Sequence, residues 1–223
     1  MLNYKNPTIA VLDSGIGGIS VLHALIDRFK VGNYIYYADN EFMPYGNKSR
    51  KQIRSRVENI INILFNQYHV DIVVLACNTA SSSMINSNDN VVKMRFNPNI
   101  PYLATRLTRS NLKSNNIIVD NTLARQIEKY IFDRKKLHTI IKKKSKVHKL
   151  DQIPSLVLGC THYELVKDIF ETVCPNTTII NNSDFILGCF DHMTFDNTDL
   201  NINVILSKYS NSYYQKLIKL INI

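Results

Sequence analysis

The sequence has no long apolar run, and this absence argues against a membrane protein. A membrane-spanning helix needs about 18 consecutive apolar residues, and no run in the 223 residues approaches that length. The N-terminus also lacks the apolar core of an export signal, because Lys5 and Asp13 bracket an apolar run that covers only residues 9–12. We therefore expect a cytoplasmic protein with no membrane partner.

Cysteine is sparse, and histidine is scattered. The four cysteines show no C-x-x-C spacing, and the six histidines are not spaced as zinc ligands are. Four cysteines in a long cytosolic chain also argue against a disulfide framework. We expect no metal site, which leaves thiols that are either reactive or simply buried: Cys77, Cys160, Cys174 and Cys189.

Nucleotide-binding signatures are incomplete. Gly15, Gly17 and Gly18 follow an apolar run, but no glycine or alanine completes the G-x-G-x-x-G spacing, and no Walker lysine follows. Two interpretations of this turn stay open. It is either a tight structural turn, which we favour, or a nest of backbone N–H groups that binds an anionic ligand such as a carboxylate.

The excess of positive charge belongs to one segment. The chain carries a formal net charge of +9, and residues 134–149 contain eight of its 27 basic residues and no acidic one. Without them, 19 basic residues face 18 acidic ones. We interpret the segment from Arg134 to Lys149 as a solvated surface, and contact with a polyanion such as nucleic acid is the alternative.

The sequence does contain an alternating order of elements in a globular composition, with 45% hydrophobic and 20% charged residues. Up to residue 80 the apolar periodicity predicts strand, helix, strand, helix, strand, which indicates a doubly wound parallel sheet and an α/β fold. The expected strands span residues 8–12, 34–38, 72–76, 100–104, 117–119, 155–158, 178–180 and 203–206. The expected helices span residues 19–29, 123–134 and 163–173, and others follow Ser49, Ser183 and Ser212.

Two similar stretches each end a predicted buried strand in a cysteine. Residues 73–81 read VVLACNTAS and residues 156–163 read LVLGCTHY, so Cys77 and Cys160 lie 83 positions apart. Ligands bind at the carboxyl ends of parallel strands, and a helix N-terminus there favours a thiolate. The pair suggests two halves of one site. A single cysteine at such a place is more often an inert buried residue.

Four stretches together resemble the glutamate racemase family. They are residues 13–21 (DSGIGGISV), 44–46 (PYG), 76–81 (ACNTAS) and 158–163 (LGCTHY), and their order and spacing agree as well as their composition. The resemblance implies an enzyme that interconverts L- and D-glutamate for peptidoglycan precursor synthesis in cell-wall biogenesis. It implies no pyridoxal phosphate, metal or other cofactor. It also implies two α/β domains with the active site in the cleft between them.

The chemistry of racemisation explains why two cysteines are needed. An α-proton must leave one face of the carbon and a proton must return to the other, and one residue cannot reach both faces. Thiols suit this task because their pKa can be tuned close to the working pH. The resemblance implies that Cys77 takes the proton from the D-isomer and Cys160 from the L-isomer, and that Asp13 and His162 assist them respectively.

The resemblance also implies substrate-binding residues and domain limits. The substrate-binding residues would be Asp13, Ser14, Tyr45, Gly46, Asn78, Thr79, Thr161 and His162. The first domain would comprise residues 1–97 and 181–223, and the second, smaller domain residues 98–180. The chain is shorter than is usual in the family, and we expect the loss between about Met84 and Pro154. Glu164 also stands where the family usually has proline.

Two alternatives to a glutamate racemase stay open. The first keeps the chemistry and changes the substrate to aspartate or another small amino acid. The second is a catalytically weak homologue that acts as a binding module for nucleic acid or protein through residues 134–149. The sequence leaves a homodimer open and gives no oligomeric state.

Overall fold

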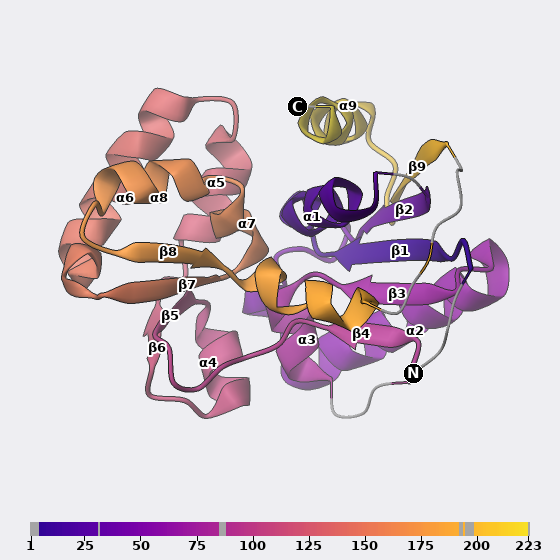
Figure 1. Cartoon of the computed structure of the whole chain (residues 1–223), viewed down its shortest axis with the longest axis horizontal. Coiled ribbons are helices and arrows are strands. Elements are labelled where there is room, and N and C mark those ends of the chain that lie inside the picture. The colour runs from indigo at the N-terminus through magenta and orange to yellow at the C-terminus, as the bar shows by residue number, and fades with distance from the viewer. Residues whose placement is uncertain (1–4, 31, 85–87, 192–193, 195–198, 223) are drawn as a thin grey trace.

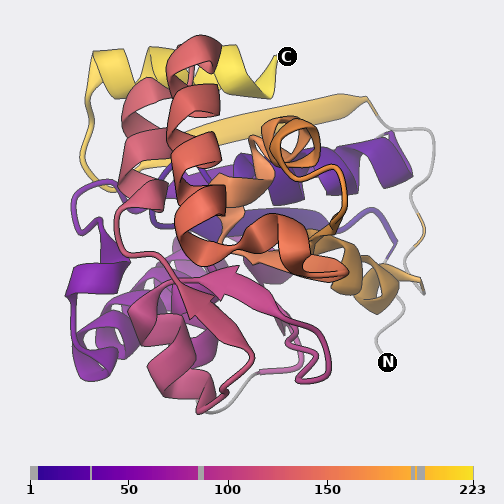
Figure 2. The same ribbon diagram turned by 90° about the vertical axis from the view of Figure 1, so that its left-hand side faces the viewer.

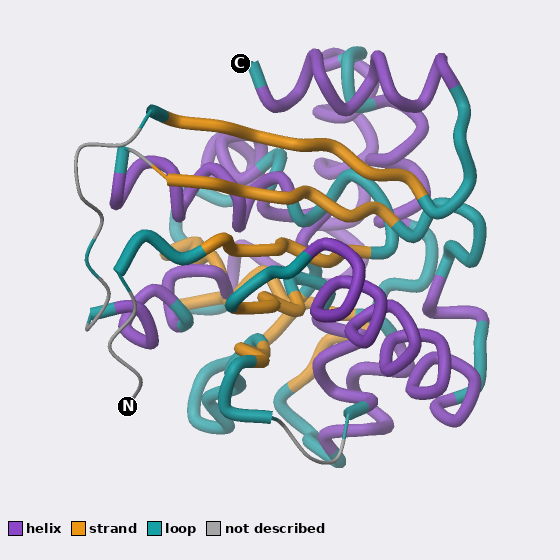
Figure 3. Tube along the Cα trace, turned by 90° about the vertical axis from the view of Figure 1, so that its right-hand side faces the viewer, coloured by secondary structure: helices purple, strands orange, loops and turns teal. Residues whose placement is uncertain are grey.

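The computed structural model describes residues 5–30, 32–84, 88–191, 194 and 199–222, and it contains two parallel β-sheets (Figure 1). The first sheet is centred on β1 (Thr8–Asp13), which lies between β2 (Gly32–Ala38) and β3 (Ile72–Leu75). β9 (Leu200–Leu206) extends it beyond β2, and β4 (Val91–Lys93) extends it beyond β3. Figure 3 shows these strands running side by side.

The second sheet repeats the strand order of the first. It contains β5 (Tyr102–Ala104), β6 (Ile117–Val119), β7 (Ser155–Gly159) and β8 (Thr178–Asn181) in the order β6-β5-β7-β8. The first sheet contains β2-β1-β3-β4 in the matching order. β3 and β7 are therefore equivalent strands, and each delivers one of the two cysteines. The prediction of two doubly wound parallel sheets related by pseudo-symmetry is confirmed.

Helices cover both faces of the first sheet. Ile9 and Val11 point into a core shared with α1 (Ile19–Phe29), whereas Ala10 and Leu12 point into a core shared with α2 (Arg50–Tyr68). This alternation of fully buried residues is expected for a parallel strand that is covered on both sides. Two more helices complete the layers, namely α3 (Asn78–Ser83) and α9 (Asn211–Ile221).

The second sheet is covered in the same way. Leu103 and Leu158 pack against the side that carries α5 (Leu123–Tyr130) and α6 (Arg134–His148), and α4 (Arg106–Leu112) lies on the other side. α7 (Thr161–Glu164) and α8 (Lys167–Val173) follow β7. One apolar core contains residues from both sheets, so the two halves are packed together.

Several expected boundaries were wrong. The helix expected over 123–134 is interrupted, because the carboxylate of Asp133 accepts a hydrogen bond from the backbone N–H of Lys136 and starts a new helix there. The basic segment is therefore α6, a helix that buries Leu137 and Ile141 and turns most of its lysines to solvent. The helix expected over 163–173 is split into α7 and α8, and the one expected after Ser183 is two 3-10 turns. α4 and β4 were not predicted.

Ser49 caps α2 as the sequence predicted. Its hydroxyl accepts from the backbone N–H of Gln52, and the Gln52 side chain accepts from the backbone N–H of Ser49. Replacing Ser49 with alanine leaves one terminal N–H group of the helix without its partner, so we expect the free energy of unfolding to fall by about 1 kcal/mol. Urea titration of S49A against S55A, an exposed position in the same helix, measures the difference.

No helix within the part of the chain that the structure describes has the length and apolar character needed to cross a membrane.

Candidate active site

Both cysteines line one cavity between the carboxyl ends of the two sheets. The cavity has a volume of about 540 Å³ and lies where β1 and β3 of the first sheet face β7 of the second. It brings together nine of the residues that the sequence singled out: Ser14, Tyr45, Gly46, Cys77, Asn78, Thr79, Cys160, Thr161 and His162. Asp13, the tenth, lies buried behind the cavity wall with 1% of its surface exposed.

Asp13 joins the two halves at the floor of this site. One carboxylate oxygen accepts a hydrogen bond from the backbone N–H of Gly15 at 2.8 Å, and the other accepts from the hydroxyl of Thr161 at 3.0 Å. Burial raises the pKa of Asp13 above its ordinary value, although the neighbouring His162 and these hydrogen bonds oppose the change. Burial therefore makes ionisation of Asp13 unfavourable, and the hydrogen bonds from Gly15 and Thr161 fix the position of its carboxylate.

Cys77 is a buried thiol at the end of β3 and the start of α3. Its sulfur lies 3.8 Å from the hydroxyl of Ser14. Burial raises the pKa of Cys77 to about 12, and negative charge on Asp13 and Cys160 acts in the same direction. This outweighs the lowering expected from the N-terminus of α3, so the thiol is neutral near pH 7.

Cys160 lies beside a buried ion pair. The Nε2 atom of His162 is 2.7 Å from a carboxylate oxygen of Glu128. Burial disfavours the imidazolium, yet Cys160 and Glu128 together raise the pKa of His162 well above its ordinary value. Burial likewise disfavours the carboxylate, but His162 and Lys216 bring the pKa of Glu128 down to about 2. His162 is therefore a cation that lies next to a thiol and is balanced by Glu128.

Neutral hydrogen-bonding groups fill the wall on the α3 side. The hydroxyl of Thr79 lies 3.2 Å from that of Thr105 and 3.3 Å from that of Thr108, so α3 of the first half meets α4 of the second. The carbonyl oxygen of Asn78 accepts from the amide of Asn182, while its own amide nitrogen is buried and has no partner among the described residues. A donor left in this way suits an anionic ligand such as a carboxylate.

The loop that carries Tyr45 and Gly46 at the mouth of the cavity is anchored by Asp39. The hydroxyl of Tyr45 donates to Asp39 at 2.8 Å, and Arg56 binds the same carboxylate through two nitrogens. The Tyr45 hydroxyl is thus occupied by Asp39. A side-chain carbon built on Gly46 would meet no atom within 4 Å, so this glycine borders open space in the cavity.

The comparisons with known proteins point one way. A search of protein-family models found no match. A protein of Clostridium acetobutylicum named glutamate racemase is 30% identical to the chain over 210 residues, which cover 82% of each protein. A protein of Caldanaerobacter subterraneus named glutamate racemase 1 is 31% identical over 202 residues, covering 79% of the chain and 75% of that protein. The chain belongs to the glutamate racemase family. It is accordingly an amino-acid racemase, an isomerase.

Solved structures of the family share the fold. Glutamate racemase RacE1 of Bacillus anthracis superposes with a TM-score of 0.82 at 22% identity, and the match covers 99% of this chain and 96% of that one. The Francisella tularensis glutamate racemase, solved in complex with D-glutamate, gives a TM-score of 0.75 at 19% identity, covering 98% and 94%. The two-sheet architecture is therefore that of glutamate racemases.

Glu128 is the main residue that sequence reasoning missed. It lies on α5, 34 positions before His162, in the region where the resemblance to the family is weak. Arg125 and Lys129 lie near it in the sequence, so it stands among other charged residues. Arg106 and Arg125 were also missed, and both are exposed cations that line the cavity. Nothing in the sequence pattern set these three residues apart.

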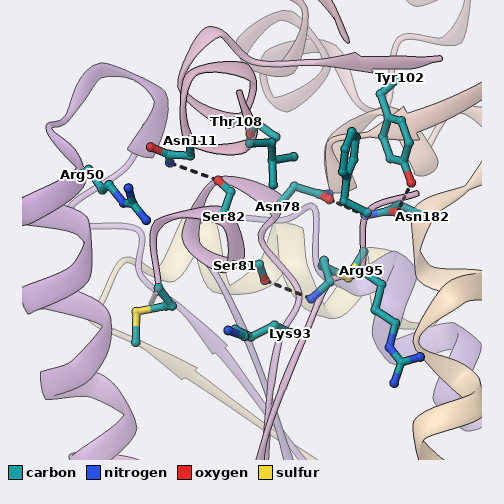
Figure 4. Close-up of a pocket in the computed structure, with 14 residues that line it drawn as sticks. Arg50, Asn78, Ser81, Ser82, Lys93, Arg95, Tyr102, Thr108, Asn111 and Asn182 are labelled. Atoms are coloured by element: carbon teal, nitrogen blue, oxygen red, sulfur yellow. Dashed lines mark hydrogen bonds between the residues drawn. The ribbon is translucent and has the colours of Figure 1, made fainter. Parts of the chain in front are cut away.

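A second cavity lies behind α3 and shares only Asn78 with the first. It has a volume of about 440 Å³, and Arg50, Lys93 and Arg95 are among the residues that line it (Figure 4). Figure 4 shows Asn78 bonded to Asn182 on this side of α3. It contains neither Cys77 nor Cys160, both of which line the first cavity.

The described residues contain no group of side chains that could bind a metal ion. Among those residues no three histidine, cysteine, aspartate or glutamate side chains come together in a way that could hold a metal ion.

Proposed function

We propose that the protein interconverts L- and D-glutamate by a cofactor-independent mechanism in which two thiols act on opposite faces of the α-carbon. The observation that carries this proposal is that Cys77 and Cys160, which follow equivalent strands of two pseudo-symmetric sheets, line the same cavity. A two-sided proton transfer requires two acid–base groups that reach the same bound molecule. The names of the relatives support glutamate as the substrate.

The proton transfers balance in both directions. Starting from L-glutamate, the thiolate of Cys160 takes the α-proton and the thiol of Cys77 gives its proton to the other face, which leaves D-glutamate, a Cys160 thiol and a Cys77 thiolate. The reverse reaction begins from that state. Because burial raises the pKa of Cys77 to about 12, Cys77 is suited to act first as the acid.

Neighbouring charges support each thiol in its role. Protonated His162 stabilises the negative charge on the sulfur of Cys160. Asp13, a buried carboxylate whose pKa is raised, assists proton exchange at Cys77. Ser14, Asn78, Thr79 and Thr161 offer neutral donors to the substrate carboxylates, and Tyr45 and Gly46 close the side of the cavity next to them.

The proposal extends to domains and to the cellular role. We assign residues 1–97 and 181–223 to a first domain and residues 98–180 to a second, each built around one of the sheets. We also propose that the protein acts in the cytoplasm and supplies D-glutamate for peptidoglycan precursors. This role in cell-wall biogenesis and cell shape follows from the proposed substrate.

Separation of glutamate enantiomers by chiral chromatography tests the activity directly. Purified protein incubated with L-glutamate should convert it to an equal mixture of both isomers, and D-glutamate should reach the same mixture. Aspartate is the matched comparison. Faster conversion of aspartate would overturn only the substrate assignment, whereas no conversion of either amino acid would overturn the proposed activity.

The binding-module alternative makes a different prediction. A nucleic-acid surface on α6 would give an affinity for DNA that falls steeply with salt concentration and survives the loss of either cysteine. The structure offers this alternative the exposed lysines of α6. Racemisation without salt-dependent DNA binding would exclude it.

A further inference from the structure

The C-terminal helix α9 reaches the active site through one lysine. The Nζ atom of Lys216 lies 3.0 Å from the Oε1 atom of Glu128, and it also donates to the backbone carbonyl of Glu128. The other carboxylate oxygen, Oε2, is the atom bound by His162. Figure 2 shows α9, in yellow, beside the helices of the second half that include α5. Glu128 is therefore shared between two cations from different halves of the chain.

We propose that Lys216 is a positioning residue for the racemase reaction: it binds one oxygen of the Glu128 carboxylate and so limits how strongly Glu128 holds the proton of His162. The inference rests on the proposed function, because His162 matters to turnover only if Cys160 does. Lys216 touches neither thiol in this arrangement and would act through Glu128 and His162.

The burial of the three groups makes the interaction strong. The side chains of His162 and Glu128 are 11% and 13% exposed, and that of Lys216 is 21% exposed, so water screens their charges weakly. An ion pair in such a setting shifts titration far more than a surface pair does. Lys219, one turn further along α9, has no such role, because its ammonium lies over the ring of Phe132.

The charges around Glu128 fix the sign of the expected effect. The titratable groups that face the Glu128–His162 pair are Asp13, Tyr36, Cys160, Tyr213 and Lys216. Lys216 is the one cation among these five, and Asp13 is an acid. Without Lys216 the full charge of Glu128 acts on His162, so the imidazolium is more completely neutralised and the proton is held more tightly. The field at the sulfur of Cys160 becomes more negative, which destabilises the anion that must form there during turnover.

The pH profile of kcat/KM tests this on the whole protein with three variants. In Lys216→Met the acidic limb of the profile, where kcat/KM rises with pH, should move to higher pH by about one unit. At a fixed pH on this limb, the shift is about a tenfold loss of kcat/KM. Lys216→Arg keeps the charge and should keep the wild-type limb. Lys219→Met removes an equal charge from the same helix and should leave the limb in place.

Two results would overturn the role of Lys216. A Lys216→Met variant that loses activity equally at every pH would make the lysine a structural support only. If the acidic limb moved as far in Lys219→Met as in Lys216→Met, the effect would belong to the net charge of the protein. Since L- and D-glutamate have equal free energies, kcat/KM for each variant must be the same in both directions, which checks the kinetics internally.

Nuclear magnetic resonance of the His162 imidazole gives a readout that needs no activity. The resonance is assigned by its loss in His162→Gln, and its titration is followed without substrate. In Lys216→Met the imidazolium should persist to higher pH than in the wild type, and an unchanged titration would overturn the inference. If the wild type fails to racemise glutamate while this shift is present, the proposed function fails and the electrostatic role of Lys216 stands.

Discussion

Replacing either Cys77 or Cys160 with serine should abolish racemisation in both directions. A serine hydroxyl is far too weak an acid to form the required anion in this cavity, and positioned acid–base groups contribute about 10²–10⁴-fold each. Rates should therefore fall by at least about 100-fold. Polarimetry of L- and D-glutamate measures the loss. Cys189→Ser, which changes a half-buried thiol outside the cavity, should keep the wild-type rate.

The two serine variants should still differ from each other. In heavy water the Cys160→Ser variant retains Cys77 and should exchange the α-hydrogen of D-glutamate only. The Cys77→Ser variant retains Cys160 and should exchange that of L-glutamate only. Proton magnetic resonance follows the α-hydrogen signal of each isomer. A single-cysteine variant that still racemised at the wild-type rate would contradict the two-thiol mechanism.

Replacing Gly17 with alanine should cost about 100-fold in kcat/KM, because misplacement of catalytic groups by about 1 Å costs that much. Gly17 lies in the turn between β1 and α1, where the two halves touch. A methyl group there would contact the hydroxyl of Thr161 and would lie 2.7 Å from the Nδ1 atom and 2.8 Å from the backbone nitrogen of His162. The halves must move apart at the point where the turn of Asp13 meets α7.

Gly188→Ala is the matched control for this substitution. The nearest atom to a methyl group at Gly188 would be a carboxylate oxygen of Asp191 at 3.8 Å, which is ordinary contact. Both variants should keep the far-ultraviolet circular dichroism of the wild type, and only Gly17→Ala should lose activity. Full activity in Gly17→Ala would contradict the close approach of the two halves.

The sequence could predict the elements whose signal is local. Apolar runs predicted the strands of both sheets except β4, and Ser49 predicted the start of α2. The same local reasoning failed where tertiary contacts decide. Three residues, Val91–Lys93, form a strand only because β3 offers them an edge. The break between α5 and α6 is different, because the cap formed by Asp133 is a local signal that sequence reasoning overlooked.

The candidate site divides in the same way. The residues carried by strand ends could be singled out from sequence, because parallel strands bring their carboxyl ends together. Glu128 and Lys216 could not, since their significance depends on α5 and α9 meeting across the molecule. The pKa of Cys77 was also expected to fall at a helix N-terminus, and burial, which the sequence does not report, decides its direction.

The origin of the hydrogen delivered to the product tests the central claim most directly. L-Glutamate is incubated with the protein in heavy water, the reaction is stopped early, and the separated isomers are analysed by mass spectrometry. If one thiol removes the α-hydrogen and a different one returns a hydrogen from solvent, the D-glutamate formed should carry deuterium at the α-carbon while the remaining L-glutamate keeps its original hydrogen. D-Glutamate that retains the original hydrogen would show that a single group serves both faces, and that result would contradict the account.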